Sequence, residues 1–338
     1  MINFELNINE IRKILSNYNI GKLVSYQKAK EGLVNQNWII KTDKGLFVLR
    51  FLEDNKKKID IIKEHKFEIE LSKKINYLVS LPIKSKKDQN IGKYKNRYFW
   101  IYNYIDGDTR YKVNNSNIKK IARLIATVHK ASENINISFD KIGSPYNVNW
   151  IIEELDEQKE YFSKNKNKYG KYFLKIYKSL IKILTELNNS KLKKEYNQLK
   201  RIVLHSDYGA SNIIWKKDNI IGLIDFDNIR KHPKIYDLAV YIAWKLYKRS
   251  KPSEISIRKV NNFLNEYNKY NKLEDNEIKH LPNIILSKLI DGIYWHFFLK
   301  INYNDRKLRF KITKDTYKRI LWVYKNKKKI QDVALGKK

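Results

Sequence analysis

A short acidic segment between apolar runs constrains the fold of this chain more than any other feature. The polar segment 205–212, His-Ser-Asp-Tyr-Gly-Ala-Ser-Asn, follows one apolar run and precedes another, and after a turn at 217–219 a third run leads into Asp225. Short apolar runs bounded by turns predict strands. We therefore predict a strand, a polar loop and a hairpin that bring Asp207, Asn212 and Asp225 to one end of the hairpin.

These three side chains meet the requirements of phosphoryl transfer. One acid orients the attacking hydroxyl or accepts its proton, while an amide oxygen and a second acid hold Mg²⁺ against the phosphates of a nucleotide. We assign the first role to Asp207 and the second to Asn212 and Asp225, with Asp227 as a ligand for a second ion. A histidine and an aspartate alone would fit an ordinary polar loop, so the prediction depends on the full spacing.

This segment resembles the catalytic loop of the kinase-like small-molecule phosphotransferases, which include aminoglycoside phosphotransferases, choline kinases and type II homoserine kinases. Their loop reads His-Gly-Asp-x-x-x-x-Asn and is followed by Ile-Asp-Phe or Ile-Asp-Trp, whereas here Ser206 replaces the glycine. The resemblance implies ATP or GTP as the phosphoryl donor and Mg²⁺ as the metal. It also implies that His205 and Asp237 support the catalytic loop from behind.

The same resemblance implies a protein-kinase-like α+β fold with two lobes. Residues 1–105 would form an N-terminal antiparallel sheet with one helix, which covers the nucleotide. Residues 106–338 would form a larger, mainly helical lobe with the catalytic loop and the acceptor pocket. The spacing of apolar residues predicts helices in that lobe, at 116–131, 150–161, 172–187, 238–247, 260–270 and 277–298.

The first hundred residues support this prediction independently. Strand-like runs within 24–50 are separated by turns, one of which contains Gly32, and they predict a three-stranded antiparallel sheet. Backbone N–H groups of such a glycine turn can cover phosphates. The series Gly32-x-x-Asn35-x-Asn37-Trp most resembles the homoserine kinase branch of the family. We therefore assign Gly32 and Asn35 to nucleotide binding.

Arg50 ends an apolar strand at the position where this fold usually has a lysine that faces the nucleotide phosphates. Arginine keeps the charge, but its planar fork differs from a compact ammonium group. Period-two alternation places it on the face opposite the preceding leucine. A helix predicted over 59–77 carries Glu68, which resembles the glutamate that pairs with this cation. Glu64 and Glu70 on the same helix remain alternatives.

Aromatic residues mark two further candidate sites. The strand-like run 98–105 resembles the segment that links the lobes and offers backbone groups to adenine, so we assign Tyr102 and Tyr104 to the base. The helices that wall the acceptor pocket in this fold supply candidate substrate contacts, namely Trp244, Asp291, Trp295 and His296. Core packing would explain each of these four residues equally well.

The predicted acceptor is a small-molecule alcohol. Homoserine or a related amino alcohol is favoured by the turn at 32–37, while an aminoglycoside, another antibiotic, choline or a sugar remains open. A non-catalytic structural protein of this fold is the alternative from another class. Such a protein should have lost an acid or the asparagine of the motif, and all of them are present here.

Composition limits the remaining functions. The chain has 338 residues, no cysteine and 42% hydrophobic residues, which suits two lobes with a sizeable core and excludes disulfides and thiolate metal sites. No apolar run approaches the roughly 18 residues of a membrane span, and no signal-like start is present, so we expect a cytoplasmic protein without a membrane partner. The net charge of +34 would attract polyanions. Because the lysines are spread along the chain, we favour compositional drift and expect no specific nucleic-acid partner. The sequence does not predict an oligomeric state.

Overall fold

The computed structural model describes residues 5–29, 35–52, 56–109, 115–139, 143–303 and 309–337. They form two compact units. The smaller unit comprises residues 1–110 together with 211–227, and the larger unit comprises residues 111–210 together with 228–338. Among the described residues, no helix has the length and apolar character needed to cross a membrane.

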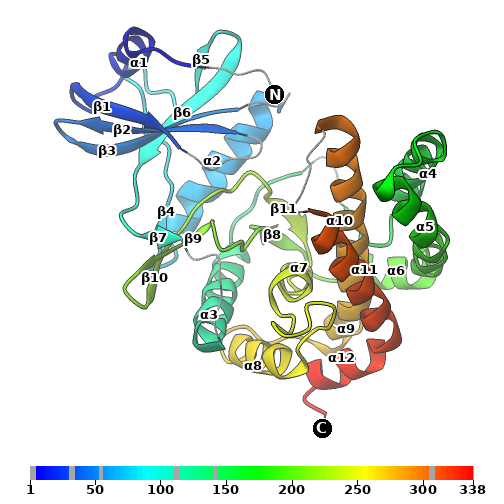
Figure 1. Cartoon of the computed structure of the whole chain (residues 1–338). Helices are drawn as coiled ribbons and strands as arrows, with labels where there is room; N and C mark the ends of the chain where they lie inside the picture. Colours follow the sequence, from blue (N-terminus) through cyan, green and yellow to red (C-terminus); the bar gives the residue numbers. More distant parts are fainter. Residues whose placement is uncertain are drawn as a thin grey trace. The chain divides into compact units, whose positions relative to one another are not determined.

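The smaller unit is built on a five-stranded antiparallel sheet (Figure 1). Its strands lie in the order β1 (Leu23–Lys28), β2 (Gln36–Thr42), β3 (Gly45–Phe51), β6 (Arg97–Asn103) and β5 (Gly92–Tyr94). Two helices accompany it, α1 (Ile8–Leu15) and α2 (Lys58–Ser72). The α1 helix begins at a capping box in which Asn7 and Glu10 satisfy each other's backbone N–H groups.

Alternation along the strands separates two buried layers, one on each face of this sheet. Leu49 belongs to the layer that includes the buried face of α1, together with Ile11 and Ile14. Val48 belongs to the other layer, together with Ile61 of α2. Successive side chains of a strand point to opposite faces. Arg50 therefore lies on the α2 face, as its spacing from Leu49 predicts.

A second sheet brings the segment 211–227 into the smaller unit. Its four strands lie in the order β4 (Leu78–Val79), β10 (Asn219–Leu223), β9 (Ile213–Lys216) and β7 (Asp108–Thr109). The β4 and β10 strands are parallel, whereas β9 pairs with both β10 and β7 in antiparallel fashion. The predicted hairpin is thus present as β9 and β10.

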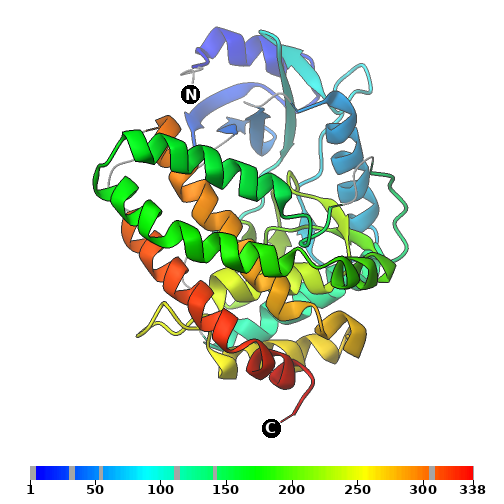
Figure 2. The same ribbon diagram turned by 90° about the vertical axis from the view of Figure 1, so that its right-hand side faces the viewer.

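The larger unit is mainly helical. A small antiparallel sheet pairs β8 (Ile202–Leu204) with β11 (Arg230–His232). Figure 2 shows α4 and α5 as a green antiparallel pair near α10 and α11, which are orange and red. The helices are α3 (Asn115–Ser132), α4 (Asn149–Lys164), α5 (Lys168–Leu187), α6 (Ser190–Gln198), α7 (Ile235–Lys245), α8 (Ile257–Asn268), α9 (Asp275–Ile278), α10 (Leu281–Tyr303), α11 (Arg309–Lys325) and α12 (Lys327–Ala334).

An antiparallel N-terminal sheet followed by a larger helical region confirms the predicted α+β class. Most predicted helices differ from the structure by one to four residues at an end, and two differ more. The helix predicted over 59–77 ends at Ser72, because the chain turns there to reach β4, which pairs with β10. The helix predicted over 277–298 is divided into α9 and α10, and Pro282 lies in the first turn of α10, where a missing N–H costs nothing.

Candidate active site

Asn212 and Asp225 lie at the same end of the β9–β10 hairpin in the smaller unit. Asn212 directly precedes β9, Asp225 follows β10 by two residues, and the N–H of Ile224 donates to the carbonyl oxygen of Asn212 at 2.9 Å. The antiparallel pairing therefore places the amide and the acid beside each other, as their spacing predicts. Asp207 belongs to the larger unit.

The backbone after β10 has an unusual conformation that aims two carboxylates. Asp225 has φ 67°, in the left-handed region that residues other than glycine adopt at a cost of about 1–2 kcal/mol. The next residue, Phe226, is buried and packs edge-on against Phe67 of α2, with ring centroids 6.0 Å apart. The packing of Phe226 holds this segment in place, so Asp225 and Asp227 both reach the α2 face of the five-stranded sheet.

Arg50 connects these two carboxylates to the sheet. Its Nη2 donates to Asp225 Oδ1 at 2.9 Å and also forms an ion pair with Asp227. The Arg50 side chain is only 7% exposed, while those of Asp225 and Asp227 are 33% and 21% exposed. Burial alone would lower the pKa of Arg50, but the two carboxylates raise it above its ordinary value. A permanent positive charge therefore stands beside the candidate metal ligands.

The α2 helix supplies two buried acids to the same region. Glu64 forms an ion pair with Lys56, and burial nevertheless raises the pKa of Glu64 to about 8. Burial, followed by the charge of Glu64, raises the pKa of Glu68 well above its ordinary value. Glu70, by contrast, forms a solvent-exposed ion pair with a lysine next to the end of this helix. Glu64 and Glu68 thus remain the candidates on this helix for the acid that acts on the Arg50 cation.

The predicted ion pair between Arg50 and Glu68 is absent from the described structure. Arg50 pairs instead with Asp225 and Asp227, whose two negative charges draw the guanidinium toward the hairpin. Glu68 still acts on Arg50 through its charge, because the positive charge of Arg50 opposes the rise in the pKa of Glu68. The helix acid is therefore a neighbour of the cation and not its direct partner.

Two asparagines of the predicted turn also face this region. The Asn35 amide nitrogen donates to Asp227, while its Oδ1 is buried without a hydrogen-bond partner. Asn37 lies opposite Arg50 in the β2–β3 register, and its Oδ1 is likewise buried and unpaired. Buried polar atoms of native proteins usually have partners, so such atoms mark a place for a ligand or water. Gly32 lies outside the described residues.

The two tyrosines assigned to the adenine base, Tyr102 and Tyr104, lie in β6 and directly after it. Tyr102 is buried on the α2 face beside Val48 and Trp100. The backbone N–H of Tyr104 donates to the Leu46 carbonyl at 3.0 Å, so a base would have to use other backbone groups of this segment. The assignment of both residues to adenine remains a prediction.

In the larger unit, the loop after β8 presents Asp207. The N–H of Gly209 donates to Asp207 Oδ1 at 3.2 Å, and the N–H of Asp207 donates to Nδ1 of His205 at 3.2 Å. His205 is fully buried, so it supports the loop from beneath. Ser206 has φ 67°, and its hydroxyl oxygen is buried without a partner. The left-handed conformation explains why a glycine suits this position.

Asp237, in the first turn of α7, lies behind this loop. Its Oδ2 is 3.1 Å from Nε2 of His129 and accepts a long hydrogen bond of 3.5 Å from the N–H of Ser206. The other ring nitrogen of His129 lies 2.9 Å from the hydroxyl of Tyr267. These groups are buried, and they connect α3, α7 and α8 to the backbone of the Asp207 loop.

Lys245, at the end of α7, is a residue that the sequence reasoning missed. Burial lowers the pKa of Lys245, and the negative charge of Asp207 opposes that shift. The two side chains therefore lie close enough for their charges to interact. No motif of the sequence contains Lys245. Its closeness to Asp207 follows from the packing of α7 on the catalytic loop, which no local spacing indicates.

The four candidate substrate contacts have different surroundings. Trp244 packs so closely on Gly292 that a Cβ atom there would lie 2.2 Å from its ring. His296 forms a 3.1 Å hydrogen bond through Nδ1 with Thr313 of α11, and Asp291 forms an ion pair with Lys288. Trp295 is 51% exposed and stacks on neighbouring rings of α10. Trp244 and His296 thus serve helix packing, whereas about half of the Trp295 surface is exposed. The assignment of these residues to the acceptor remains a prediction.

The oxygen atoms near the hairpin match the needs of Mg²⁺ bound to a nucleotide. The described residues contain no group of three or more acidic, histidine or cysteine side chains placed to hold a metal ion alone. Mg²⁺ in nucleotide sites usually takes one or two carboxylates and completes its shell with phosphate oxygens and water. Asp225 and Asp227 supply the two carboxylates that such a site needs, and the amide oxygen of Asn212 adds a neutral ligand.

Comparison with known proteins shows which family and which solved structures this chain resembles. Residues 25–273 match a family model described as "Phosphotransferase enzyme family". A homoserine kinase of Parvibaculum lavamentivorans is 25% identical over 300 residues, which cover 84% of this chain and 86% of that protein. An aminoglycoside phosphotransferase from Alicyclobacillus acidocaldarius superposes with a TM-score of 0.67 at 12% identity, covering 94% of this chain and 95% of the other. An amicoumacin kinase solved with AMP-PNP, Ca²⁺ and Ami superposes with a TM-score of 0.66 at 15% identity, covering 93% of each chain.

Proposed function

Because the chain belongs to the phosphotransferase enzyme family, we propose that it transfers the γ-phosphoryl group of ATP to the hydroxyl of homoserine. The chain is a kinase-like, ATP-dependent phosphotransferase that acts on a hydroxyl of a small molecule. The identity of the acceptor is the part that is proposed. Relatives named homoserine kinase, which match over most of both chains, support it.

The electrostatic interaction of Lys245 with Asp207, within the larger unit, is the observation that carries this acceptor. A half-buried cation whose charge interacts with that of Asp207 favours an acceptor that brings a carboxylate, because opposite charges attract more strongly where access of water is reduced. Homoserine carries both a carboxylate and a primary hydroxyl. Choline and aminoglycosides bring only positive charge, which Lys245 would repel.

Within this proposal, Asp207 orients the homoserine hydroxyl and takes its proton as the hydroxyl oxygen bonds to the γ-phosphorus. The bond between that phosphorus and the bridging oxygen breaks, and ADP leaves. The hydrogen bond from the N–H of Gly209 fixes the Asp207 carboxylate for this task. His205 and Asp237 hold the backbone on which the carboxylate depends.

The triphosphate would be held by residues of the smaller unit. We assign Asn212, Asp225 and Asp227 as oxygen ligands of Mg²⁺, which when bound neutralises the charge of the phosphate oxygens. Arg50 already contacts both acids and would reach the same phosphates. Lys56, which donates to the Asp227 carbonyl at 3.0 Å, adds a second cation. The unpaired amide oxygens of Asn35 and Asn37 are suited to donors on water or the nucleotide.

A panel of acceptors tests the proposal. ADP release is measured with Mg²⁺–ATP and, in turn, homoserine, choline, kanamycin and glycerol, and homoserine should give the highest kcat/KM. Lys245→Met should raise the KM for homoserine by about tenfold to a hundredfold, since a charge-assisted hydrogen bond contributes about 1.5–3 kcal/mol. Lys251→Met removes an exposed lysine and should change nothing. If another acceptor is phosphorylated and homoserine is not, the acceptor is wrong while the phosphotransferase activity stands.

A further inference from the structure

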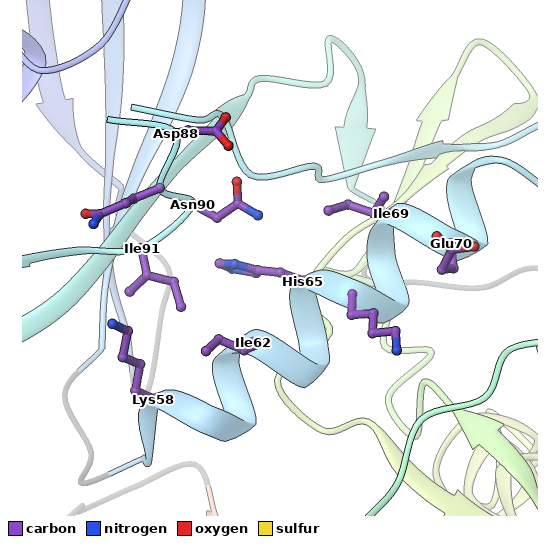
Figure 3. Close-up of a pocket in the computed structure, with 10 residues that line it drawn as sticks. Lys58, Ile62, His65, Ile69, Glu70, Asp88, Asn90 and Ile91 are labelled. Carbon is purple, nitrogen blue, oxygen red and sulfur yellow. The ribbon is translucent and has the colours of Figure 1, made fainter. Parts of the chain in front are cut away.

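A pocket of about 380 Å³ lies on a different side of α2 from the two buried glutamates. Its walls come from α2 and from residues 88–91, which lead into β5, and Figure 3 shows both. The pocket residues of α2 recur at helical spacing, as Ile62, His65 and Ile69, whereas Glu64 and Glu68 form a separate row. None of the residues assigned to the nucleotide lines this pocket.

The floor of the pocket holds polar atoms that lack partners. His65 is only 3% exposed, and neither of its ring nitrogens has a hydrogen-bond partner among the described residues. The side-chain oxygen of Asn90 is also buried and unpaired. Figure 3 shows the His65 ring extending from α2 toward Asn90 and Ile91. Leaving such atoms unpaired costs free energy, so a ligand that paired with them would gain affinity.

His65 presents one donor and one acceptor to this space. Burial, followed by the charges of Lys56 and Arg50, lowers the pKa of His65 to about 4. The ring is therefore neutral at physiological pH, with one protonated nitrogen and one free lone pair. The Asn90 oxygen adds a second acceptor. A hydroxyl group, which both donates and accepts, matches this arrangement.

The walls and the rim of the pocket indicate which other chemical groups a ligand would need. Three isoleucines, Ile62, Ile69 and Ile91, give the pocket an apolar surface. Two cations, Lys58 and Lys66, also line it, and neither forms an ion pair within the part of the chain that the structure describes. The two acids of the lining, in contrast, each form an ion pair with a lysine outside the pocket. The uncompensated charge of the pocket is thus positive.

We propose that this pocket is a second ligand site, which takes a small aliphatic hydroxy acid. The carboxylate lies at Lys58 and Lys66, the hydroxyl bonds to His65 and Asn90, and a branched alkyl group packs on the isoleucines. Ligand sites usually measure about 300–1,000 Å³. A pocket of about 380 Å³ therefore fits a molecule of a few carbon atoms and excludes a nucleotide.

The site is adjacent to the phosphate-binding region without being part of it. The His65 ring meets Trp100 edge-on, with centroids 5.1 Å apart. Trp100 lies opposite Arg50 in the β3–β6 register, and the Arg50 guanidinium carbon is 5.7 Å from the Trp100 ring. A single aromatic ring thus separates the pocket floor from Arg50.

Calorimetric titration of the full chain with 2-hydroxy-3-methylbutanoate tests the proposal. This probe should bind saturably with one site per chain. 3-Methylbutanoate, which lacks the hydroxyl, should bind about two- to tenfold more weakly, because one net hydrogen bond is worth about 0.5–1.5 kcal/mol. 3-Methylbutane-1,2-diol, which lacks the carboxylate, should give no saturable heat. Absence of saturable binding by the hydroxy acid would overturn the proposal.

Three variants distinguish this pocket from general attraction to a basic chain. His65→Leu removes both ring nitrogens at similar volume and should weaken the hydroxy acid about tenfold or more, while thermal stability is kept. Lys58→Ala, a surface change, should weaken it severalfold. Lys74→Ala removes an exposed lysine just beyond α2 and should leave affinity unchanged. Equal binding by wild type and His65→Leu, or equal losses in Lys58→Ala and Lys74→Ala, would contradict the assignment.

Discussion

Replacing Ser206 with glycine should stabilise the larger unit, because this residue bears two separate penalties. Its φ of 67° costs a residue other than glycine about 1–2 kcal/mol. Its hydroxyl oxygen is buried without a partner, which costs about 1 kcal/mol at the lower end of the usual range. Glycine gives back about 0.5–1 kcal/mol through the greater freedom of the unfolded chain. The net gain for Ser206→Gly is therefore about 2 kcal/mol.

Ser206→Ala separates the two penalties. Alanine removes the hydroxyl but keeps the Cβ atom, so it should gain only about 1 kcal/mol. For a unit of roughly 200 residues, each kcal/mol raises Tm by about 2–4 °C. Scanning calorimetry should then show a rise of roughly 4–8 °C for Ser206→Gly and about half of that for Ser206→Ala. A Tm for Ser206→Gly at or below that of wild type would refute the reasoning, and a smaller gain for Ser206→Gly than for Ser206→Ala would show that the backbone penalty is absent.

Three further predictions concern protonation, the cation and the metal. Burial lowers the pKa of His65 to about 4, so its ring stays neutral in the folded chain while the unfolded chain protonates it below about pH 6.5. Between pH 7 and 4, the Tm of His65→Leu should therefore fall less than the Tm of wild type, and parallel pH profiles of the two proteins would count against this shift. Arg50→Ala should raise the KM for ATP and lower kcat, with little change in the KM for the acceptor. Arg50→Lys should recover part of this loss, because the positive charge remains. If the ATP kinetics of Arg50→Ala stay within about twofold of wild type, Arg50 does not contact the phosphates. Asp225→Ala should abolish tight binding of Mg²⁺–ATP in calorimetry, and Asn212→Ala should weaken that binding less, because it removes only a neutral ligand. Unchanged affinity for Mg²⁺–ATP in Asp225→Ala would exclude Asp225 as a metal ligand.

Local features of the sequence predicted the elements that carry the candidate site. Short apolar runs and a turn indicated the β9–β10 hairpin, so their spacing alone placed Asn212 and Asp225 at one end of it. Period-two alternation placed Arg50 on the α2 face for the same reason. Both predictions depend only on residues that are near each other in the chain, where backbone geometry relates spacing to direction.

Partners that are distant in the chain could not be predicted. Arg50 bonds to acids 175 and 177 residues away, and nothing in its local sequence distinguishes them from Glu68. The effect of Asp207 on Lys245 likewise depends on where α7 ends relative to the catalytic loop. Such contacts are decided by tertiary packing. The family resemblance supplied a role for Glu68, but it did not supply the geometry of this chain.

ADP release by Asp207→Asn, with Mg²⁺–ATP and homoserine, tests the central claim most directly. Asparagine keeps the shape of the side chain but cannot take the proton of the hydroxyl, and such a role is worth about 10²–10⁴ in rate. We predict a fall in kcat of that size with calorimetric binding of Mg²⁺–ATP retained, while Asp218→Asn in the exposed turn between β9 and β10 keeps wild-type turnover. Turnover by Asp207→Asn close to that of wild type would contradict the account.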